Sequence, residues 1–165
     1  MTTKTKSKPP KTTRPHMPGY GLPKTKKGLL PWKWAEDRLK KSRQFWIATT
    51  RPDGRPHVMI VWGLWLENDF WFSTGGKSRK AQNLAGNPRC VISSDNSEQA
   101  VIVEGEAEIV TDTASLKVVF AAYKKKYKFD PSSMGEPIFR VKPGVAFGLF
   151  EKKFGQTATR WIFPK

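Results

Sequence analysis

The sequence predicts a mainly β fold with peripheral helices (α+β), built as an antiparallel barrel. Seven or eight strand-like segments follow one another through short turns, and only three segments have helical character. Short turns between consecutive strands produce antiparallel pairing. Antiparallel strands in that number, with long apolar members, favour a closed or nearly closed barrel over an open sheet with free edges.

The 165-residue chain divides into a basic arm, residues 1–31, and a barrel domain, residues 32–165. Residues 1–33 hold nine of the 30 lysines and arginines and no acidic residue, and residues 1–31 hold six of the 13 prolines. Such a segment has too little apolar surface to offset the entropy of ordering it. We therefore expect a disordered arm. It is either a solubilising tail without a dedicated partner or a weak, non-specific contact for nucleic acid.

The first half of the barrel domain predicts one helix and a three-stranded meander. The helix covers residues 31–43, with a proline early and basic residues late, as the helix dipole prefers. The strands are expected at 45–50, 56–66 and 70–74, separated by an Asp-Gly turn and a short polar turn. The apolar run in 56–66 is continuous rather than alternating, so we expect both faces of this strand to be covered.

The second half predicts two helices and five strands. The helices are expected at 78–85 and 112–127, and the strands at 89–94, 100–110, 138–142, 145–150 and 157–163. Gly105 in mid-strand indicates a bulge or a close backbone approach. Cys90, the single cysteine, excludes an internal disulfide and a cysteine metal cage, and its strand-like surroundings predict a small buried hydrophobe.

The start of the helix at 78–85 carries charges of the wrong sign. Ser78 is a good N-cap, but Arg79 and Lys80 follow it at the positive end of the helix dipole. Free backbone N–H groups and two cations form a phosphate site by ordinary electrostatics, to which Ser73 and Thr74 add hydroxyl groups. The alternative is that both cations point into solvent and that the serine only caps the helix. The residues alone leave both interpretations open.

This segment resembles the phosphate-binding segment of the pyridoxamine 5′-phosphate oxidase-like superfamily, which are split-barrel flavoproteins. The resemblance rests on motifs in register over about residues 34 to 163: Ser73-Thr74, Arg79-Lys80-Ala81, Asn87-Pro88-Arg89, Pro56-His57-Val58 and the stretch from Val101 to Ala107. It implies an antiparallel split β-barrel, assembled as a homodimer with one flavin at each subunit interface.

The resemblance also implies the site residues. Arg79 and Lys80 would hold the phosphate of FMN or of the deazaflavin F420. The hydroxyl groups of Ser73, Thr74 and Ser78 would assist them. The strand residues that would lie along the flavin ring are Met59, Ile60, Val61 and Trp62. Trp161 resembles the aromatic residue that reaches a flavin from the partner subunit, and ordinary barrel packing is its alternative role.

The chain departs from the pyridoxamine phosphate oxidases at three places. Val58 and Gly63 stand where that pattern has a basic residue at each end of the ring-facing strand segment, and Gln99 falls one residue away from its glutamine contact. The stretch 160–163, Arg-Trp-Ile-Phe, lacks the C-terminal Arg-x-His substrate signature. The vitamin B6 substrate site is therefore missing. The chain resembles the divergent branch that uses FMN or F420 to reduce varied substrates.

The leading hypothesis is an FMN- or F420-dependent oxidoreductase that acts on an unidentified small molecule. The alternative is a non-catalytic flavin or planar-ligand binder, and the third is a nucleic-acid-associated protein acting through the arm. Only His57 is a candidate for proton transfer, as expected where a cofactor ring does the chemistry. We expect no metal site. Without an apolar stretch of membrane length or a signal-peptide core, we expect a cytoplasmic protein with no membrane contact.

Overall fold

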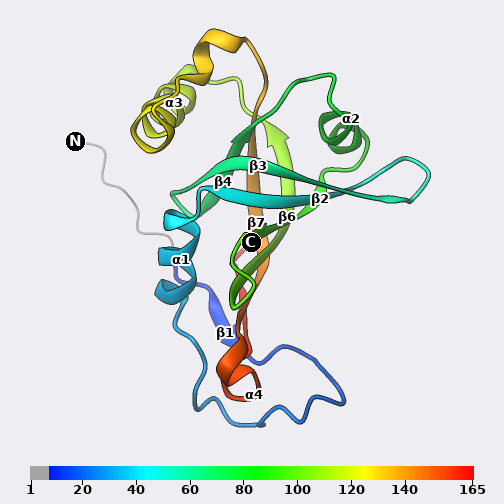
Figure 1. Cartoon of the computed structure of the whole chain (residues 1–165), viewed down its shortest axis with the longest axis vertical. Helices are drawn as coiled ribbons and strands as arrows, with labels where there is room; N and C mark the ends of the chain where they lie inside the picture. Colours follow the sequence, from blue (N-terminus) through cyan, green and yellow to red (C-terminus); the bar gives the residue numbers. More distant parts are fainter. Residues whose placement is uncertain (1–7) are drawn as a thin grey trace.

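The structure is a computed structural model that describes residues 8–165 (Figure 1). The helices are α1 (Trp32–Lys41), α2 (Arg79–Gly86), α3 (Thr113–Tyr127) and the short α4 (Phe154–Thr157), with two 3₁₀ turns, Pro131–Met134 and Glu151–Lys153. The strands are β1 (Lys11–Thr13), β2 (Gln44–Thr50), β3 (Pro56–Leu66), β4 (Asp69–Ser73), β5 (Arg89–Ser94), β6 (Gln99–Ile109), β7 (Ile138–Phe150) and β8 (Thr159–Ile162). The three helices and the meander predicted from sequence are confirmed to within a few residues at their ends.

Six antiparallel strands form a closed barrel in the order β7-β4-β3-β2-β5-β6, with β6 pairing back onto β7. β7 is 13 residues long and serves two neighbours on one edge: β4 pairs with its first part and β8 with its last part. The predicted mainly β, antiparallel barrel is thereby confirmed. Within residues 8–165, no helix combines the length and apolar character needed to cross a membrane.

The separate strands predicted at 138–142 and 145–150 are wrong, because both belong to β7. Pro143 and Gly144 lie between them, opposite the register shift at Glu104/Gly105 of β6. A Cβ on Gly105 would lie 2.4 Å from the carbonyl oxygen of Lys142, so only glycine permits this close approach. The predicted bulge at Gly105 is confirmed. It bends the sheet at the point where the sequence had predicted a break between two strands.

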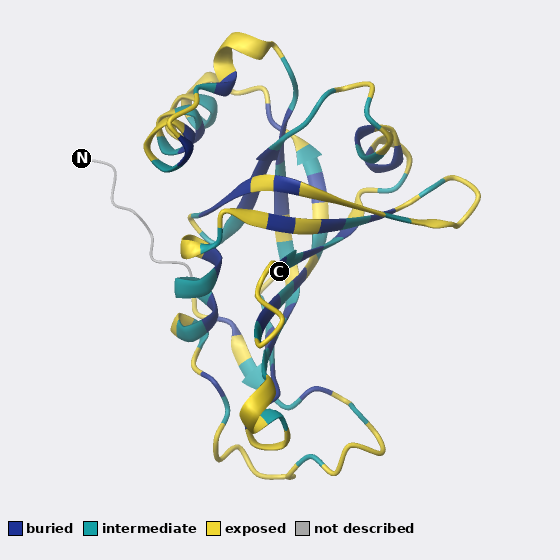
Figure 2. Cartoon of the chain, in the orientation of Figure 1, coloured by how far each residue is buried: buried dark blue, intermediate teal, exposed yellow. Residues whose placement is uncertain are grey.

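The apolar core fills the barrel, and a smaller cluster lies under α3 (Figure 2). The barrel core is rich in fully buried aromatic residues, among them Phe45, Phe70, Phe72 and Trp161. Cys90 belongs to this core as predicted, and burial raises the pKa of its thiol to about 12. The smaller cluster joins Val119, Tyr123 and Tyr127 of α3 to the sheet, and so fixes α3 beside β3.

The expectation of a disordered arm is wrong for residues 8–31, while residues 1–7 lie outside the described part. Lys11–Thr13 pairs with β8, and Leu30 is buried in the core. The Arg14 guanidinium donates hydrogen bonds to the carbonyl oxygens of four residues: Thr25, Lys27, Gln156 and Ala158. The arm is held by backbone pairing and by the hydrogen bonds of one arginine, and neither requires apolar residues. The low hydropathy of the arm therefore did not predict that it packs against the barrel.

Candidate functional site

The site begins with a strand edge that has no neighbouring strand within residues 8–165. β3 pairs with β4 only over Gly63–Leu66, whereas residues 56–62 pair with β2 alone. Alternate residues of 58–61 therefore direct backbone N–H and C=O groups toward an open edge. This edge matches the requirement of a planar ligand with polar atoms along its rim.

The prediction that both faces of β3 are covered is wrong for the chain by itself. The exposed fractions are 50% for Val58, 49% for Met59, 45% for Ile60 and 45% for Trp62. The reason is the split in the barrel: within residues 8–165, β4 pairs with β3 only from Gly63 onward, and α3 contacts the outer side of β3 only from Trp62 onward. The bands of exposed residues along β2 and β3 are visible in Figure 2.

Two tyrosines of α3 fix the point where the open edge ends. The Tyr123 hydroxyl donates to the carbonyl oxygen of Trp62 at 3.0 Å. The Tyr127 hydroxyl accepts from the Gly63 N–H at 3.0 Å, and the Trp62 ring stacks on the Tyr127 ring with centroids 4.8 Å apart. Sequence analysis predicted the helix over 112–127 that carries both tyrosines but assigned them no role. A buried tyrosine hydroxyl needs a hydrogen-bond partner, and this requirement was the signal in the sequence that could have indicated their role.

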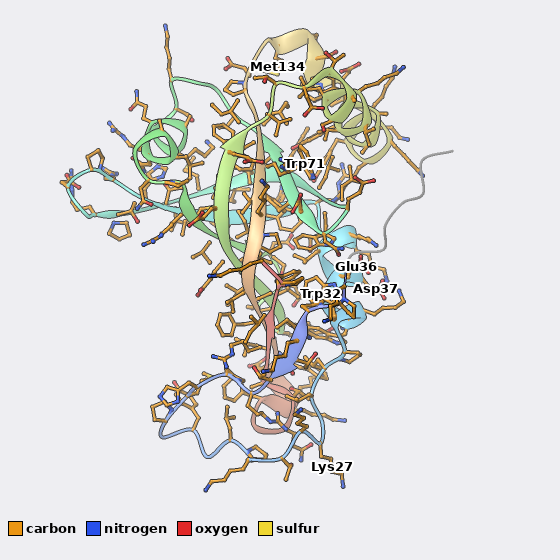
Figure 3. All side chains as sticks on the ribbon, turned by 180° about the vertical axis from the view of Figure 1, so that it is seen from behind. Lys27, Trp32, Glu36, Asp37, Trp71 and Met134 are labelled. Atoms are coloured by element: carbon orange, nitrogen blue, oxygen red, sulfur yellow. The ribbon has the colours of Figure 1, made fainter. Side chains whose placement is uncertain are left out.

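A pocket of about 240 Å³ opens beside this edge, between β3, the end of β4, α2 and the loop after α3. Six predicted site residues line it: Ile60, Val61, Trp62, Ser73, Thr74 and Lys80. The loop contributes Phe129 and Met134, the latter labelled at the end of the molecule in Figure 3. Larger hollows of about 410 and 1220 Å³ lie elsewhere, but neither includes the open edge at 58–61 or the cations of α2.

The first turn of α2 has the predicted capped geometry. The Ser78 hydroxyl accepts from the Ala81 N–H at 3.3 Å and lies 3.3 Å from the Thr74 hydroxyl. Within residues 8–165, the side chains of Arg79 and Lys80 form no hydrogen bond and no ion pair, although Lys80 is partly buried in the pocket wall. Burial lowers the pKa of Lys80. Two cations thus stand at a helix N-terminus without an anion to balance them.

Glu136 is a pocket residue that sequence analysis missed. Its carboxylate accepts a hydrogen bond of 2.8 Å from the Gly76 N–H, which joins the loop after α3 to the loop before α2. The Ser73 hydroxyl donates to the carbonyl oxygen of Pro137 in the same loop. These contacts hold the pocket wall in place, and no sequence motif marks them.

Four predicted site residues lie away from the pocket lining. Ser78 and Arg79 stand at the start of α2 beside it, and Met59 points to the opposite face of β3 from Ile60. Trp161 is fully buried, with its ring 5.3 Å from the Trp32 ring in an edge-to-face contact. The structure therefore places Trp161 in the barrel core, which is its alternative packing role, rather than at a surface that another subunit could reach.

Comparison with known proteins identifies the family. The sequence pattern of the pyridoxamine 5′-phosphate oxidase family matches residues 32–148. The chain belongs to this family. A pyridoxine/pyridoxamine 5′-phosphate oxidase from Pseudomonas paraeruginosa is 35% identical over 88 residues, which cover 47% of this chain and 40% of that protein. The chain therefore spans less than half the length of this curated relative.

Solved structures of the family share the fold. The conserved hypothetical protein Rv2991 from Mycobacterium tuberculosis superposes with a TM-score of 0.67 and 25% identity, covering 79% of this chain and 91% of that one. An F420 reductase superposes with a TM-score of 0.56 and 27% identity, covering 67% of this chain and 94% of that one. The split barrel and the family resemblance predicted from sequence are confirmed by these matches.

Proposed function

We propose that the protein binds FMN, or alternatively F420, and acts as a flavin- or deazaflavin-dependent oxidoreductase on a small molecule. The observation that carries the proposal is the pair of unpartnered cations, Arg79 and Lys80, beside the open edge of β3. A phosphate at a helix N-terminus gains from backbone N–H groups, from the dipole and from charge-assisted hydrogen bonds together. The similarity to an F420 reductase supports the deazaflavin alternative.

The residues present fit such a cofactor. Arg79 and Lys80 would hold the phosphate, with the hydroxyl groups of Thr74 and Ser78 beside them. The open backbone edge at 58–61 supplies donors and acceptors for the polar rim of the ring system. When bound, the cofactor supplies hydride transfer, and the protein supplies position and electrostatics. The pocket then needs no catalytic acid, base or nucleophile of its own.

The structure argues against vitamin B6 oxidation as the reaction. Gly63 packs so closely on Phe70 that a Cβ there would lie 2.1 Å from the ring. No basic side chain is therefore accommodated at this end of the ring-facing segment, where the resemblance gives the oxidases one. Val58, at the other end, is also apolar. We propose a different substrate for this chain.

We also propose that the protein is a homodimer whose second copy covers the outer face of β2 and β3. Trp46 lies opposite Ile60 and Gln44 opposite Trp62, so both tryptophans and Ile60 share one face. Their exposed fraction is 45% each, which makes an apolar patch next to the pocket. Adjacent exposed apolar side chains of this size mark interaction surfaces. A second copy there would enclose the cofactor ring and exclude water from it.

The function is tested on the purified full chain. We expect the protein to bind FMN or F420, identified by its visible spectrum and by mass spectrometry. The bound cofactor is expected to be reduced by a nicotinamide donor and reoxidised by an electron acceptor. Failure to bind either cofactor would contradict the proposal, and a bound cofactor that neither donor nor acceptor can reach would leave a binding protein without catalysis.

The dimer is tested by light scattering with saturating cofactor. Trp46→Glu is expected to shift the protein toward monomer, because it places a charge in the apolar patch. Val118→Glu is the matched control, since Val118 is 51% exposed on α3, outside the patch. A parent protein that is monomeric at micromolar concentration would contradict the dimer without touching the cofactor assignment.

A further inference from the structure

The hairpin that joins β2 to β3 presents two basic side chains toward α2. Thr49 lies opposite His57 in the β2–β3 register, so these two side chains share a face. Arg51 comes directly after the end of β2, near enough for its charge to act on His57. Asn83 of α2 donates a buried hydrogen bond of 2.9 Å to the Thr49 hydroxyl, which fixes α2 over the same face. Figure 1 shows α2 beside this hairpin.

Polar atoms without partners gather at this contact. Within residues 8–165, seven buried side-chain nitrogen or oxygen atoms have no hydrogen-bond partner, and three of them are Arg51 Nε, His57 Nδ1 and Asn83 Oδ1. A buried donor or acceptor left unpaired costs about 1–3 kcal/mol. Native proteins hold few such atoms, and each requires an explanation. Two of these three, Arg51 Nε and His57 Nδ1, can donate to a bound anion, whereas Asn83 Oδ1 is an acceptor and is not part of this argument.

The charge around these atoms is positive. Burial lowers the pKa of His57, and the neighbouring charges of Arg51, Lys80 and Arg79 lower it further. The same three cations that act on the histidine form no ion pair within the described residues. The other arginine of the turn behaves differently: Arg55 is paired with Asp53, with Nη2 2.8 Å from the carboxylate. Arg51 is thus the turn cation that lacks an anion.

We propose that Arg51 is a third cation of the phosphate site, and that His57 donates a hydrogen bond from Nδ1 to the same anion. The inference rests on the proposed function, because the anion is the phosphate of FMN or the phosphodiester of F420. The guanidinium would supply Nε–H to a phosphate oxygen, as arginine does in charge-assisted pairs. The anion would then be held between α2 and the β2–β3 turn, rather than by α2 alone.

The test compares Arg51→Ala with Arg55→Ala, two substitutions in one turn with the same loss of charge. We expect Arg51→Ala to weaken FMN binding by about tenfold or more, the range of one charge-assisted hydrogen bond, and to leave riboflavin binding unchanged. Arg55→Ala is expected to change neither. Arg51→Lys, which keeps the charge, should retain part of the affinity, and His57→Ala should weaken FMN binding to a smaller extent. If the cofactor is F420, the phosphate-free deazaflavin takes the place of riboflavin.

Three results would overturn the inference. The first is equal FMN affinity in Arg51→Ala and the parent. The second is an equal loss of FMN and riboflavin binding, which would show a structural role. The third is a parent that binds neither cofactor, which removes the proposed function as well. If Arg79→Ala/Lys80→Ala loses FMN while Arg51→Ala does not, only the role of Arg51 fails. Should Arg51→Ala unfold, ³¹P NMR of bound FMN decides, since Arg51→Lys should shift the phosphate signal and Arg55→Lys should not.

Discussion

The arm and the first turn of α2 are both basic, but the structure uses their charges in opposite ways. In the arm, Arg14 donates to four backbone carbonyl oxygens and ties residues 25–27 to residues 156–158. At α2, Arg79 and Lys80 donate to no atom of residues 8–165. A cation whose donors are satisfied by the chain holds the fold together. A cation that the chain leaves unsatisfied is available to a ligand.

Removing residues 1–30 is expected to have the largest effect on stability. The deletion removes β1, the Arg14 contacts and the buried Leu30 side chain, whose burial alone stabilises by about 1.5–3 kcal/mol. We expect a loss of about 3 kcal/mol or more in the free energy of unfolding, measured by urea denaturation. A disordered arm, as expected from the sequence composition, would instead give almost no change in the free energy of unfolding. An unaltered denaturation midpoint would show that the arm does not stabilise the fold, and it would contradict the difference drawn between the arm and α2.

Arg14→Ala is expected to have an intermediate effect. Several of its hydrogen bonds lie at the surface, so water replaces them in part, and we expect a loss of about 1–2 kcal/mol. Cofactor affinity should stay the same. The matched control is Lys24→Ala, an exposed cation of the same loop. A loss of FMN binding in Arg14→Ala at unchanged stability would show that the arm belongs to the site.

Substitution of Lys126 is expected to have the smallest effect on stability, and the size of this effect depends on pH. It donates to the carbonyl oxygens of Ser42 and Gly63, and burial together with the Arg43 charge lowers its pKa from 10.5 to about 8. Between these values the folded protein binds fewer protons than the unfolded chain, so stability should rise with pH across this window. The stability of Lys126→Gln, measured by urea midpoints, should rise less steeply than that of the parent between pH 7.5 and 10. Lys125→Gln, at an exposed position in the same turn, should follow the parent.

Much of the fold and half of the site were predictable because they depend on local chemistry. The Ser78 cap, the bulge at Gly105 and the cations at 79–80 each follow from neighbouring residues. The long-range features were not predictable. The arm pairs with β8 across 147 residues, and the open edge of β3 depends on where β4 stops pairing. Neither property leaves a pattern within one segment.

The partial exposure of β3 is a second feature that the sequence of one segment could not predict. Its continuous apolar run predicted a strand covered on both faces, but residues 8–165 leave part of it exposed. The covering group on the outer face is expected to be a second subunit and a cofactor. Similarly, an indole at position 161 suits a ligand contact and a barrel core equally well, and only tertiary packing distinguishes them.

The most direct test of the account is the affinity of Arg79→Ala/Lys80→Ala for FMN and for riboflavin, or for F420 and its phosphate-free deazaflavin. Charge-assisted hydrogen bonds contribute about 1.5–3 kcal/mol each, so we expect the double substitution to weaken binding of the phosphorylated ligand on the order of a hundredfold or more. Binding of the phosphate-free ligand should be unchanged. The apo fold should be as stable as the parent or slightly more stable, because two cations leave the positive end of a helix dipole. Equal affinity of the double variant and the parent for the phosphorylated ligand, or an unfolded variant, would contradict the account.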